Sequence, residues 1–464
     1  MKNVRLSSTN LTASVASLAW PIFIAHAAAM THPVIDTLMV ARFSSTDLAA
    51  LAIGASIYVS IYIGFYGMMQ SLTPTFGQLF GAGEFPEIGR QVQQGVWMAI
   101  FLSLIGSFLL FFPTPFLYLA NASPEVAQKA TLYLRFLAFG LPALLSFLVY
   151  VSLNNAIARP KMVMLIQVSA LFLKVPLNFV VIFGWFGFPA MGGPGCGLVS
   201  LIIIWIVLGA SLIVLRFNPS YHFLQIFSQG IAGPRWKDMK ELLKLGVPLG
   251  LNYFIEVTSF TIGALLIARI GIEAVGGHQI ISNFSLVVYM LPLATANATA
   301  TLVAQAIGAK DLSLARQVAF SGQRLAATVA IFLSVIIWFS KDIIVGAYTS
   351  DPEIVKYALP LLLFVCAYQF FDAVQITSAH ILRAHKVVLA PTLLYLISFW
   401  CIGLGGGYVF AFDVFNLGLP DLITGVSGFW FSCCISLMVL AAFLLILLKR
   451  VEKRAVEPDI TSEV

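Results

Sequence analysis

Twelve long apolar stretches, separated by short polar connections, most strongly constrain what this chain can fold into. A helix needs about 20 apolar residues to cross the hydrocarbon core of a bilayer, and each stretch has that length or more. The stretches use nearly the whole chain and leave no room for a sizeable soluble domain. We therefore expect an all-α polytopic membrane protein with spans at 13–40, 48–80, 93–119, 126–156, 162–186, 195–215, 243–267, 275–307, 314–338, 354–381, 388–410 and 425–448.

The composition supports a membrane environment. Only 10% of the residues are charged and the mean hydropathy is +0.95, whereas soluble proteins carry about 25% charged residues. Continuous apolar runs exclude an outer-membrane barrel, whose strands alternate apolar and polar residues. A pI near 9.0 is also typical of nucleic-acid-binding proteins. Here the basic residues lie between spans, so the positive-inside rule explains them and no nucleic-acid partner is expected.

The distribution of Lys and Arg predicts the orientation of the chain. If both termini are cytoplasmic, the cytoplasmic segments hold eighteen of the 26 Lys and Arg residues. These are Lys2, Arg5, Arg90, Arg159, Lys161, Arg216, Arg235, Lys237, Lys240, Lys244, Lys310, Arg316, Arg383, Lys386, Lys449, Arg450, Lys453 and Arg454. Six lie on the opposite face, namely Arg42, Lys129, Arg135, Arg269, Lys341 and Lys356. Because cytoplasmic loops carry an excess of these residues, we predict that both termini lie inside the cell.

The chain contains an internal duplication. The segments Pro21–Arg42 and Pro248–Arg269 match at an offset of 227 residues. With one residue of slippage, Arg90-Gln91-Val92 matches Arg316-Gln317-Val318. A unit of six spans returns the chain to its starting side, so both copies share one orientation. The two lobes are therefore expected to be related by a pseudo-two-fold axis along the membrane normal.

This duplication predicts the domain organisation and favours a carrier. We expect an N-terminal lobe at 1–217, a cytoplasmic linker at 218–241, a C-terminal lobe at 242–450 and a cytoplasmic tail at 451–464. Parallel repeats place a substrate site in a cleft between lobes near mid-membrane. No nucleotide-binding motif is present, so we expect the carrier to be driven by an ion gradient. We also expect a monomer with no cofactor and no enzymatic activity.

Four charged residues stand deep inside the predicted spans and break the repeat. They are Asp36, Lys174, Glu256 and Asp372. A charge at the bilayer centre costs about 2.5 to 3.5 kcal/mol on insertion scales, so each one needs a partner or a function. One interpretation is a structural ion pair between helices. The other is that at least one of the three acids has no permanent basic partner and binds a cation or a proton.

Helical spacing adds neighbours to these charges, because residues four apart share a face. The pairs are His32 with Asp36, Lys174 with Asn178, Tyr368 with Asp372, and Gln279 with Asn283. Pro33 removes a backbone donor and is expected to bend the first span beside Asp36. We expect Phe254 and Phe284 to lie near the carboxylates, and acidic with aromatic side chains suit a lipophilic organic cation.

Several segments, in order along all twelve spans, resemble the multidrug and toxic compound extrusion (MATE) family, and in particular its bacterial NorM-like branch. They include Ala19-Trp-Pro-Ile, Val34-Ile-Asp-Thr-Leu-Met, Pro176-Leu-Asn-Phe, Gly192-Gly-Pro-Gly-Cys-Gly, Phe254-Ile-Glu-Val-Thr, Gly277-His-Gln-Ile and Tyr368-Gln-Phe-Phe-Asp-Ala-Val-Gln. The resemblance implies two six-helix lobes in a bacterial inner membrane that export cationic drugs against inward Na⁺ or H⁺.

The resemblance also implies roles for individual residues. It implies a cation site in the second lobe at Glu256, Asp372 and Tyr368, with both acids as candidate Na⁺ ligands. It implies a polar centre in the first lobe at Asp36 and Asn178. Drug contacts are implied at Gln279, Asn283 and Asp351. The sequence departs from the family pattern at Lys174, where a neutral polar residue is common, and at His32.

These departures favour H⁺ over Na⁺ in the first lobe. An ammonium group of Lys174 near Asp36 would repel Na⁺ in a low-dielectric site, and His32 is suited to relay a proton. The alternative is a permanent Lys174–Asp36 pair, with coupling left to the second lobe.

Two other functions remain open. They are a lipid-linked oligosaccharide flippase of the same superfamily and a major facilitator type carrier. A flippase needs a basic cavity for its pyrophosphate, whereas three of the four deep charges are acidic. A facilitator carrier usually has a Gly-x-x-x-Asp-Arg-x-Gly-Arg-like loop between spans two and three, where this chain has Gly81-Ala-Gly-Glu-Phe-Pro-Glu-Ile-Gly-Arg.

Overall fold

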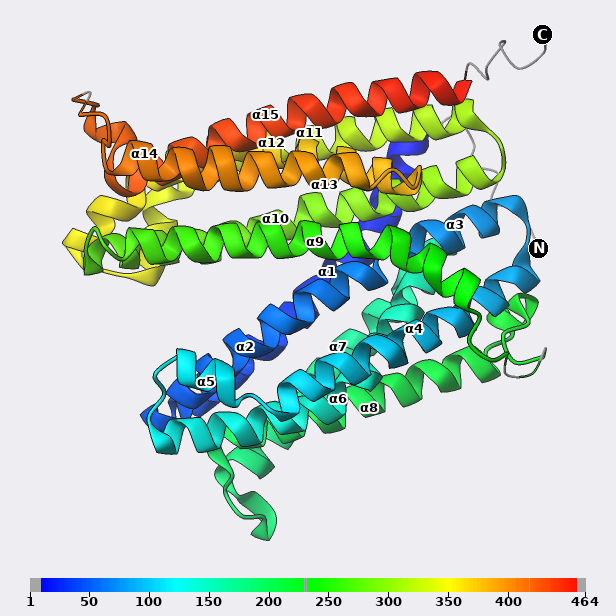
Figure 1. Cartoon of the computed structure of the whole chain (residues 1–464), viewed down its shortest axis with the longest axis horizontal. Coiled ribbons are helices and arrows are strands. Elements are labelled where there is room, and N and C mark those ends of the chain that lie inside the picture. The colour runs from blue at the N-terminus through cyan, green and yellow to red at the C-terminus, as the bar shows by residue number, and fades with distance from the viewer. Residues whose placement is uncertain (1–9, 229, 231, 417, 457–464) are drawn as a thin grey trace. The chain divides into compact units, whose positions relative to one another are not determined.

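The structure, a computed structural model, describes residues 10–228, 230, 232–416 and 418–456. Residues 1–9, with Lys2 and Arg5 of the predicted cytoplasmic face, and tail residues 457–464 lie outside this part. Figure 1 shows a chain built of long helices. They are α1 (Leu11–Ala41), α2 (Ser45–Met69), α3 (Leu72–Ala82), α4 (Phe85–Phe111), α5 (Thr114–Leu119), α6 (Pro124–Ala156), α7 (Pro160–Phe183), α8 (Gly192–Phe217), α9 (Trp236–Ile267), α10 (Ile272–Gly308), α11 (Leu312–Tyr348), α12 (Pro352–Ala384), α13 (Leu389–Tyr395), α14 (Gly407–Ala411) and α15 (Gly425–Val456).

Twelve helical segments in the described part are long and apolar enough to cross a membrane, which confirms the predicted number of spans. Helices α2 and α3 together make the second span, Ser45–Ala82. The eleventh span, Leu389–Ala411, is less regular, because a π-helical segment at Leu396–Gly406 lies between α13 and α14. The apolar pattern did not predict this segment.

The chain divides into two compact units that follow the internal repeat. The first unit is Ile24–Gly250, and the second unit comprises the described residues up to Phe23 and from Leu251. The two boundaries fall inside α1 and α9 and are 227 residues apart, the offset of the repeat. The units thus differ from the expected lobes at 1–217 and 242–450. The linker and the start of α9 belong to the first unit, and the start of α1 belongs to the second.

Close approach between helices positions the polar centre of the first unit. Apolar burial gives little driving force between helices in lipid, so small residues that admit a neighbour carry much of the packing. Tyr133 of α6 lies between Gly54 of α2 and Gly197 of α8. A Cβ atom on Gly54 or Gly197 would come within 2.7 or 2.9 Å of the Tyr133 ring. The ring is thereby held within electrostatic range of Asp36 on α1.

Helix α12 is the centre of the second unit and packs against α10, α11 and α15. Its buried Tyr368 ring lies 5.9 Å, between centroids, from Trp430 of α15. Helix α10 offers α11 and α12 a surface of small buried residues, among them Ala294, Ala298 and Thr299. The interior of this unit is largely apolar, and α12 carries more of its buried polar side chains than any other described helix.

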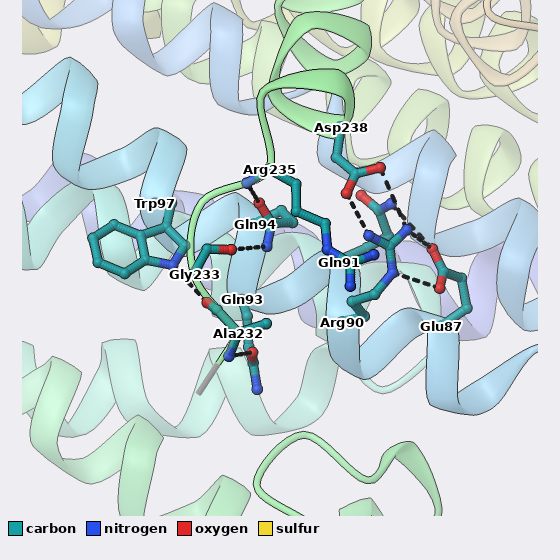
Figure 2. Close-up of polar contacts among 10 residues, drawn as sticks. All are labelled: Glu87, Arg90, Gln91, Gln93, Gln94, Trp97, Ala232, Gly233, Arg235 and Asp238. Atoms are coloured by element: carbon teal, nitrogen blue, oxygen red, sulfur yellow. Dashed lines mark hydrogen bonds and ion pairs between the residues drawn. The ribbon is translucent and has the colours of Figure 1, made fainter. Parts of the chain in front are cut away.

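The predicted linker is bound along α4 of the first unit (Figure 2). Three side chains of α4 form hydrogen bonds with its backbone. Gln93 donates to the carbonyls of Ile226 (2.7 Å) and Gly230 (2.8 Å) and accepts from the N–H of Ala232 (2.7 Å). Gln94 donates to the carbonyl of Gly233 (3.0 Å) and accepts from the N–H of Arg235 (2.8 Å). Trp97 donates to the carbonyl of Ala232 (2.9 Å). We call these contacts the linker latch.

Both ends of the linker are fixed as well. At the start of α9, Asp238 forms an ion pair with Arg90 of α4, which also pairs with Glu87. Near α8, the buried Tyr221 donates a 2.6 Å hydrogen bond to Asn154 of α6. Burial raises the pKa of the Tyr221 phenol, so it remains a donor at neutral pH. The linker is thus a packed part of the first unit.

Candidate ion and substrate site

The first polar centre is a buried ion pair in direct contact, inside the first unit. The ammonium group of Lys174 on α7 lies 2.7 Å from Asp36 Oδ2 on α1, and Asn178 donates a 2.8 Å hydrogen bond to Asp36 Oδ1. The three side chains are at most 5% exposed. The predicted contact between Lys174 and Asp36 is confirmed. It forms because Lys174 and Asn178, one helical turn apart on α7, both face α1.

Further groups surround this pair. Ser200 of α8 accepts a 3.2 Å hydrogen bond from Lys174, which brings a third helix to the centre. The phenol of Tyr133 and the thiol of Cys196 lie within electrostatic range of Asp36. Asp36 is therefore charge-balanced by one cation and hydrogen-bonded by one amide.

The two residues expected beside Asp36 on α1 lie as the helical spacing requires. His32, partly buried, is within electrostatic range of Lys174. Pro33 is exposed, and α1 continues through it as one helical segment, with the Thr37 hydroxyl bonded to the Pro33 carbonyl (2.9 Å). The proton relay through His32 and the functional bend at Pro33 stay predictions.

The second polar centre lies inside the second unit and contains two acids. Glu256 of α9 and Asp372 of α12 lie close enough to repel each other electrostatically. Tyr368, one turn before Asp372, also lies within electrostatic range of it. Among the described residues, no Lys or Arg forms a salt bridge with either acid, in contrast to the first centre. Their placement together fits the predicted cation site, whose ligands remain a proposal.

Two residues at this centre were missed by the sequence interpretation. Gln375 donates a 3.0 Å hydrogen bond to Asp372 Oδ1, and Tyr395 of α13 donates a 2.7 Å hydrogen bond to the Gln375 amide oxygen. The spacing of three residues places Gln375 within reach of Asp372 on the same helix. No pattern in the sequence indicates the contact with Tyr395, because it joins two different helices.

The candidate drug contacts are less uniform. Gln279 and Asn283 of α10 are exposed and share a 3.3 Å hydrogen bond, as their spacing predicted. Phe254 of α9 is 44% exposed, whereas Phe284 packs partly buried against the apolar core of the second unit. Asp351 is exposed and caps the start of α12, where it accepts a hydrogen bond from Glu353 N–H. A capping role accounts for this carboxylate locally, and a drug contact stays a prediction.

Two further buried charges escaped the sequence interpretation. Asp47 of α2 is 3% exposed and binds Lys129 of α6 (2.7 Å) and Gly193 N–H at the start of α8 (2.8 Å). Arg383 of α12, which we assigned to the cytoplasmic face, is 8% exposed and lies 5.9 Å from the Tyr253 ring. Asp47 is satisfied by its partners and ties three helices together. Arg383 is a buried cation of the second unit that the count of deep charges left out.

Comparison with known proteins identifies the family. The family model MatE matches this chain twice, over residues 21–180 and 248–409, which repeats the offset of the duplication. The chain belongs to the MATE family. It is 38% identical to a probable multidrug resistance protein NorM of Aromatoleum aromaticum, over 94% of this chain and 93% of that one. It is 32% identical to the multidrug resistance protein MdtK of Photorhabdus laumondii, with 93% of each chain covered.

The fold of this MATE family member agrees with solved structures. The eukaryotic MATE transporter AtDTX14 superposes with a TM-score of 0.84 at 19% identity, covering 97% of this chain and 98% of that one. The predicted fold class, twelve membrane-spanning helices in two six-helix halves, is thereby confirmed, and so is the resemblance to the NorM-like branch. The protein is a multi-pass membrane protein.

Proposed function

We propose that this MATE family member is a secondary active antiporter that exports lipophilic organic cations in exchange for inward H⁺ or Na⁺. Its relatives are multidrug resistance proteins by name, which supports small-molecule export. Transport would proceed by alternating access between the two lobes. We place the protein in the bacterial inner membrane as a monomer with both termini cytoplasmic. No observation favours the flippase or the major facilitator carrier over a MATE transporter.

The observation that carries the proposal is the pair of acids in the second unit. Glu256 and Asp372 repel each other and have no salt-bridge partner among the described residues. A cation or proton at this centre would relieve the repulsion, so occupancy by an ion and occupancy by a cationic drug compete. One charge moving down about 150 mV releases roughly 3.5 kcal/mol, and a monovalent drug cation that leaves against the same potential consumes an equal amount. A drug gradient of a few hundred-fold therefore needs a second inward ion, or a concentration gradient of the coupling ion worth about 3.5 kcal/mol.

We favour H⁺ as the coupling ion at the first centre. The ammonium of Lys174 already occupies the position beside Asp36 that a bound Na⁺ would take. Protonation of Asp36 removes the charge that holds Lys174, and thereby loosens the tie between α1 and α7. The alternative is that the Lys174–Asp36 pair is structural and that only the second centre couples.

Uptake of a fluorescent organic cation into everted membrane vesicles tests the proposed function. A pH gradient, acidic inside, and a Na⁺ gradient are imposed in turn. We expect uptake with the pH gradient and none in vesicles without the protein. Absence of uptake with both gradients would overturn the antiport proposal, and uptake with Na⁺ alone would overturn the preference for H⁺.

A further inference from the structure

The side chains Gln375 and Tyr395 form a buried chain of hydrogen bonds that ends on Asp372. Tyr395 is 3% exposed, Gln375 has no exposure, and Asp372 is 6% exposed. The Tyr395 hydroxyl donates to Gln375 Oε1 (2.7 Å), and Gln375 Nε2 donates to Asp372 Oδ1 (3.0 Å). Buried polar groups are costly without partners, so these two hydrogen bonds fix the three side chains in one arrangement.

The hydroxyl of Tyr395 decides which end of the Gln375 amide faces Asp372. An amide has a donor end and an acceptor end. Because Tyr395 donates to the oxygen, the NH₂ group must point at the carboxylate. Without the Tyr395 hydroxyl, the amide is free to turn over and present its oxygen instead, and that geometry requires a protonated Asp372.

Other titratable groups surround Asp372, but none of those in the described chain donates a hydrogen bond to it. Glu256 from α9, Tyr289 from α10, Tyr395 from α13 and Cys433 from α15 lie within electrostatic range, and Tyr368 lies on α12 itself. Within the described chain, Gln375 is the hydrogen-bond donor placed on Asp372. A donor to the charged form stabilises it, so Gln375 holds Asp372 as a carboxylate.

The π-helical segment keeps Tyr395 in place. It begins directly after Tyr395, and hydroxyl groups from two neighbouring helices bond to its carbonyls. The bonds are Ser259 to Phe399 (2.9 Å), Ser432 to Ile402 (2.7 Å) and Ser436 to Ser398 (2.6 Å). π-helical turns inside helices are frequent at functional sites.

The same segment is tied to the helix that carries Glu256. Trp400 Nε1 donates to the carbonyl of Ile255 (3.2 Å), next to Glu256, and Ser259 lies one turn further along α9. The eleventh span therefore connects both acid-bearing helices, through Tyr395 and Gln375 on one side and through Trp400 and Ser259 on the other.

We propose that Tyr395 and Gln375 are positioning residues of the ion-coupling centre, which fix Asp372 as the carboxylate that receives the coupling ion. The proposal rests on the proposed function and deepens it. It predicts that both residues set the pH range over which the centre works, although neither carries a charge at neutral pH.

Tyr395→Phe tests this with little change in shape. Loss of a fixed donor to Asp372 makes protonation easier, so the pH of half-maximal proton-driven uptake should rise by about one unit, a tenfold change in proton concentration. Gln375→Leu should move the midpoint in the same direction. Tyr408→Phe is the matched control, since Tyr408 is a partly exposed phenol in the same span, and its midpoint should equal that of the wild type.

A second measurement keeps the test independent of transport. In purified protein, the infrared carbonyl band of protonated Asp372 is identified by its absence in Asp372→Asn and is followed against pH. The band midpoint should rise by about one pH unit, to a tenfold lower proton concentration, in Tyr395→Phe and stay unchanged in Tyr408→Phe. An unchanged midpoint in Tyr395→Phe would overturn the positioning role. A shifted band in a protein that does not transport would instead refute the antiport function alone.

Discussion

The two units treat their buried carboxylates in opposite ways. In the first unit, the buried Asp36 is neutralised at contact by Lys174 and bonded by Asn178. In the second unit, Glu256 and Asp372 lie within electrostatic range of each other, and Asp372 accepts a hydrogen bond from the neutral Gln375. A carboxylate with a resident cation resists an incoming ion, whereas a pair of like charges attracts one. We therefore predict that the two units contribute unequally to coupling.

The repeat explains why this difference concerns function more than packing. At the offset of 227, Asp36 corresponds to Gly263 and Glu256 to Ala29. Later in the repeat the offset is 224, which matches Ile157-x-Arg159 with Ile381-x-Arg383, and there Asp372 corresponds to Leu148 and Gln375 to Val151. The duplicated framework thus folds with an apolar residue at each of these positions. Each centre is an addition to one copy of the unit.

The largest expected effect comes from removing the charges of the second centre. Glu256→Gln and Asp372→Asn should each reduce gradient-driven export by about a hundredfold or more, because the amides keep the shape of the side chains and lose the ion-binding charge. Uptake into everted vesicles measures the loss. Asp342→Asn, an exposed acid of α11, is the control and should export normally.

Normal export by both second-centre variants would break the comparison. The second unit would then be structural, and coupling would have to lie with the Asp36 pair. Thermal unfolding of the purified variants shows whether a loss of export reflects a loss of folding.

A smaller and more selective effect is expected at the first centre. Lys174→Asn leaves Asp36 buried without its cation, and breaking a buried pair costs about 3 to 5 kcal/mol of stability. The double variant Asp36→Asn with Lys174→Asn should recover part of this loss. If the pair couples to H⁺, the single variant should lose proton-driven export or become dependent on Na⁺, measured at constant pH with and without Na⁺.

Unchanged proton-driven export in Lys174→Asn would show that the pair is structural. That result would sharpen the comparison, since it would leave the acids of the second unit as the sole coupling centre.

The sequence predicted those features that depend on local pattern. Apolar length predicted the number of spans, although the third span, expected at 93–119, lies at Phe85–Phe111. The four-residue spacing placed Lys174 with Asn178 and Gln279 with Asn283. The Lys174–Asp36 contact was also predictable, because a buried lysine needs an acid and the family resemblance brings α7 near α1.

Apart from Gln375 with Asp372, which lie three residues apart, the contacts that were missed join residues on different helices and leave no local pattern. Tyr395 and Gln375 lie on different helices, and so do Asp47 and Lys129. The π-helical segment was missed because its stability comes from hydroxyl groups of neighbouring helices, although its glycine-rich sequence was visible. Arg383 was counted as cytoplasmic because a charge near a span end is usually exposed, yet here it is buried over Tyr253.

A second comparison separates α4 from its repeat-related helix α11. The motif Arg90-Gln91-Val92 recurs as Arg316-Gln317-Val318, yet the latch residues that follow do not. At the same offset of 226, Gln93, Gln94 and Trp97 correspond to Ala319, Phe320 and Gln323. The linker packs along α4, so these three polar residues serve a contact that belongs to the first copy of the repeat.

The smallest expected effect follows from this second comparison. Gln94 has no exposure and holds Gly233 and Arg235 by two hydrogen bonds, so Gln94→Leu leaves two backbone groups of the linker without partners. Each unsatisfied buried group costs about 1 to 3 kcal/mol, which favours release of the linker. Cleavage by trypsin at Arg235 should become about tenfold faster, while export changes less than about twofold because no ion-binding group is altered. Gln317→Leu, an exposed residue of α11, should leave cleavage unchanged. Equal cleavage rates for Gln94→Leu and the wild type would show that the latch does not hold the linker, and the difference between α4 and α11 would then have no structural consequence.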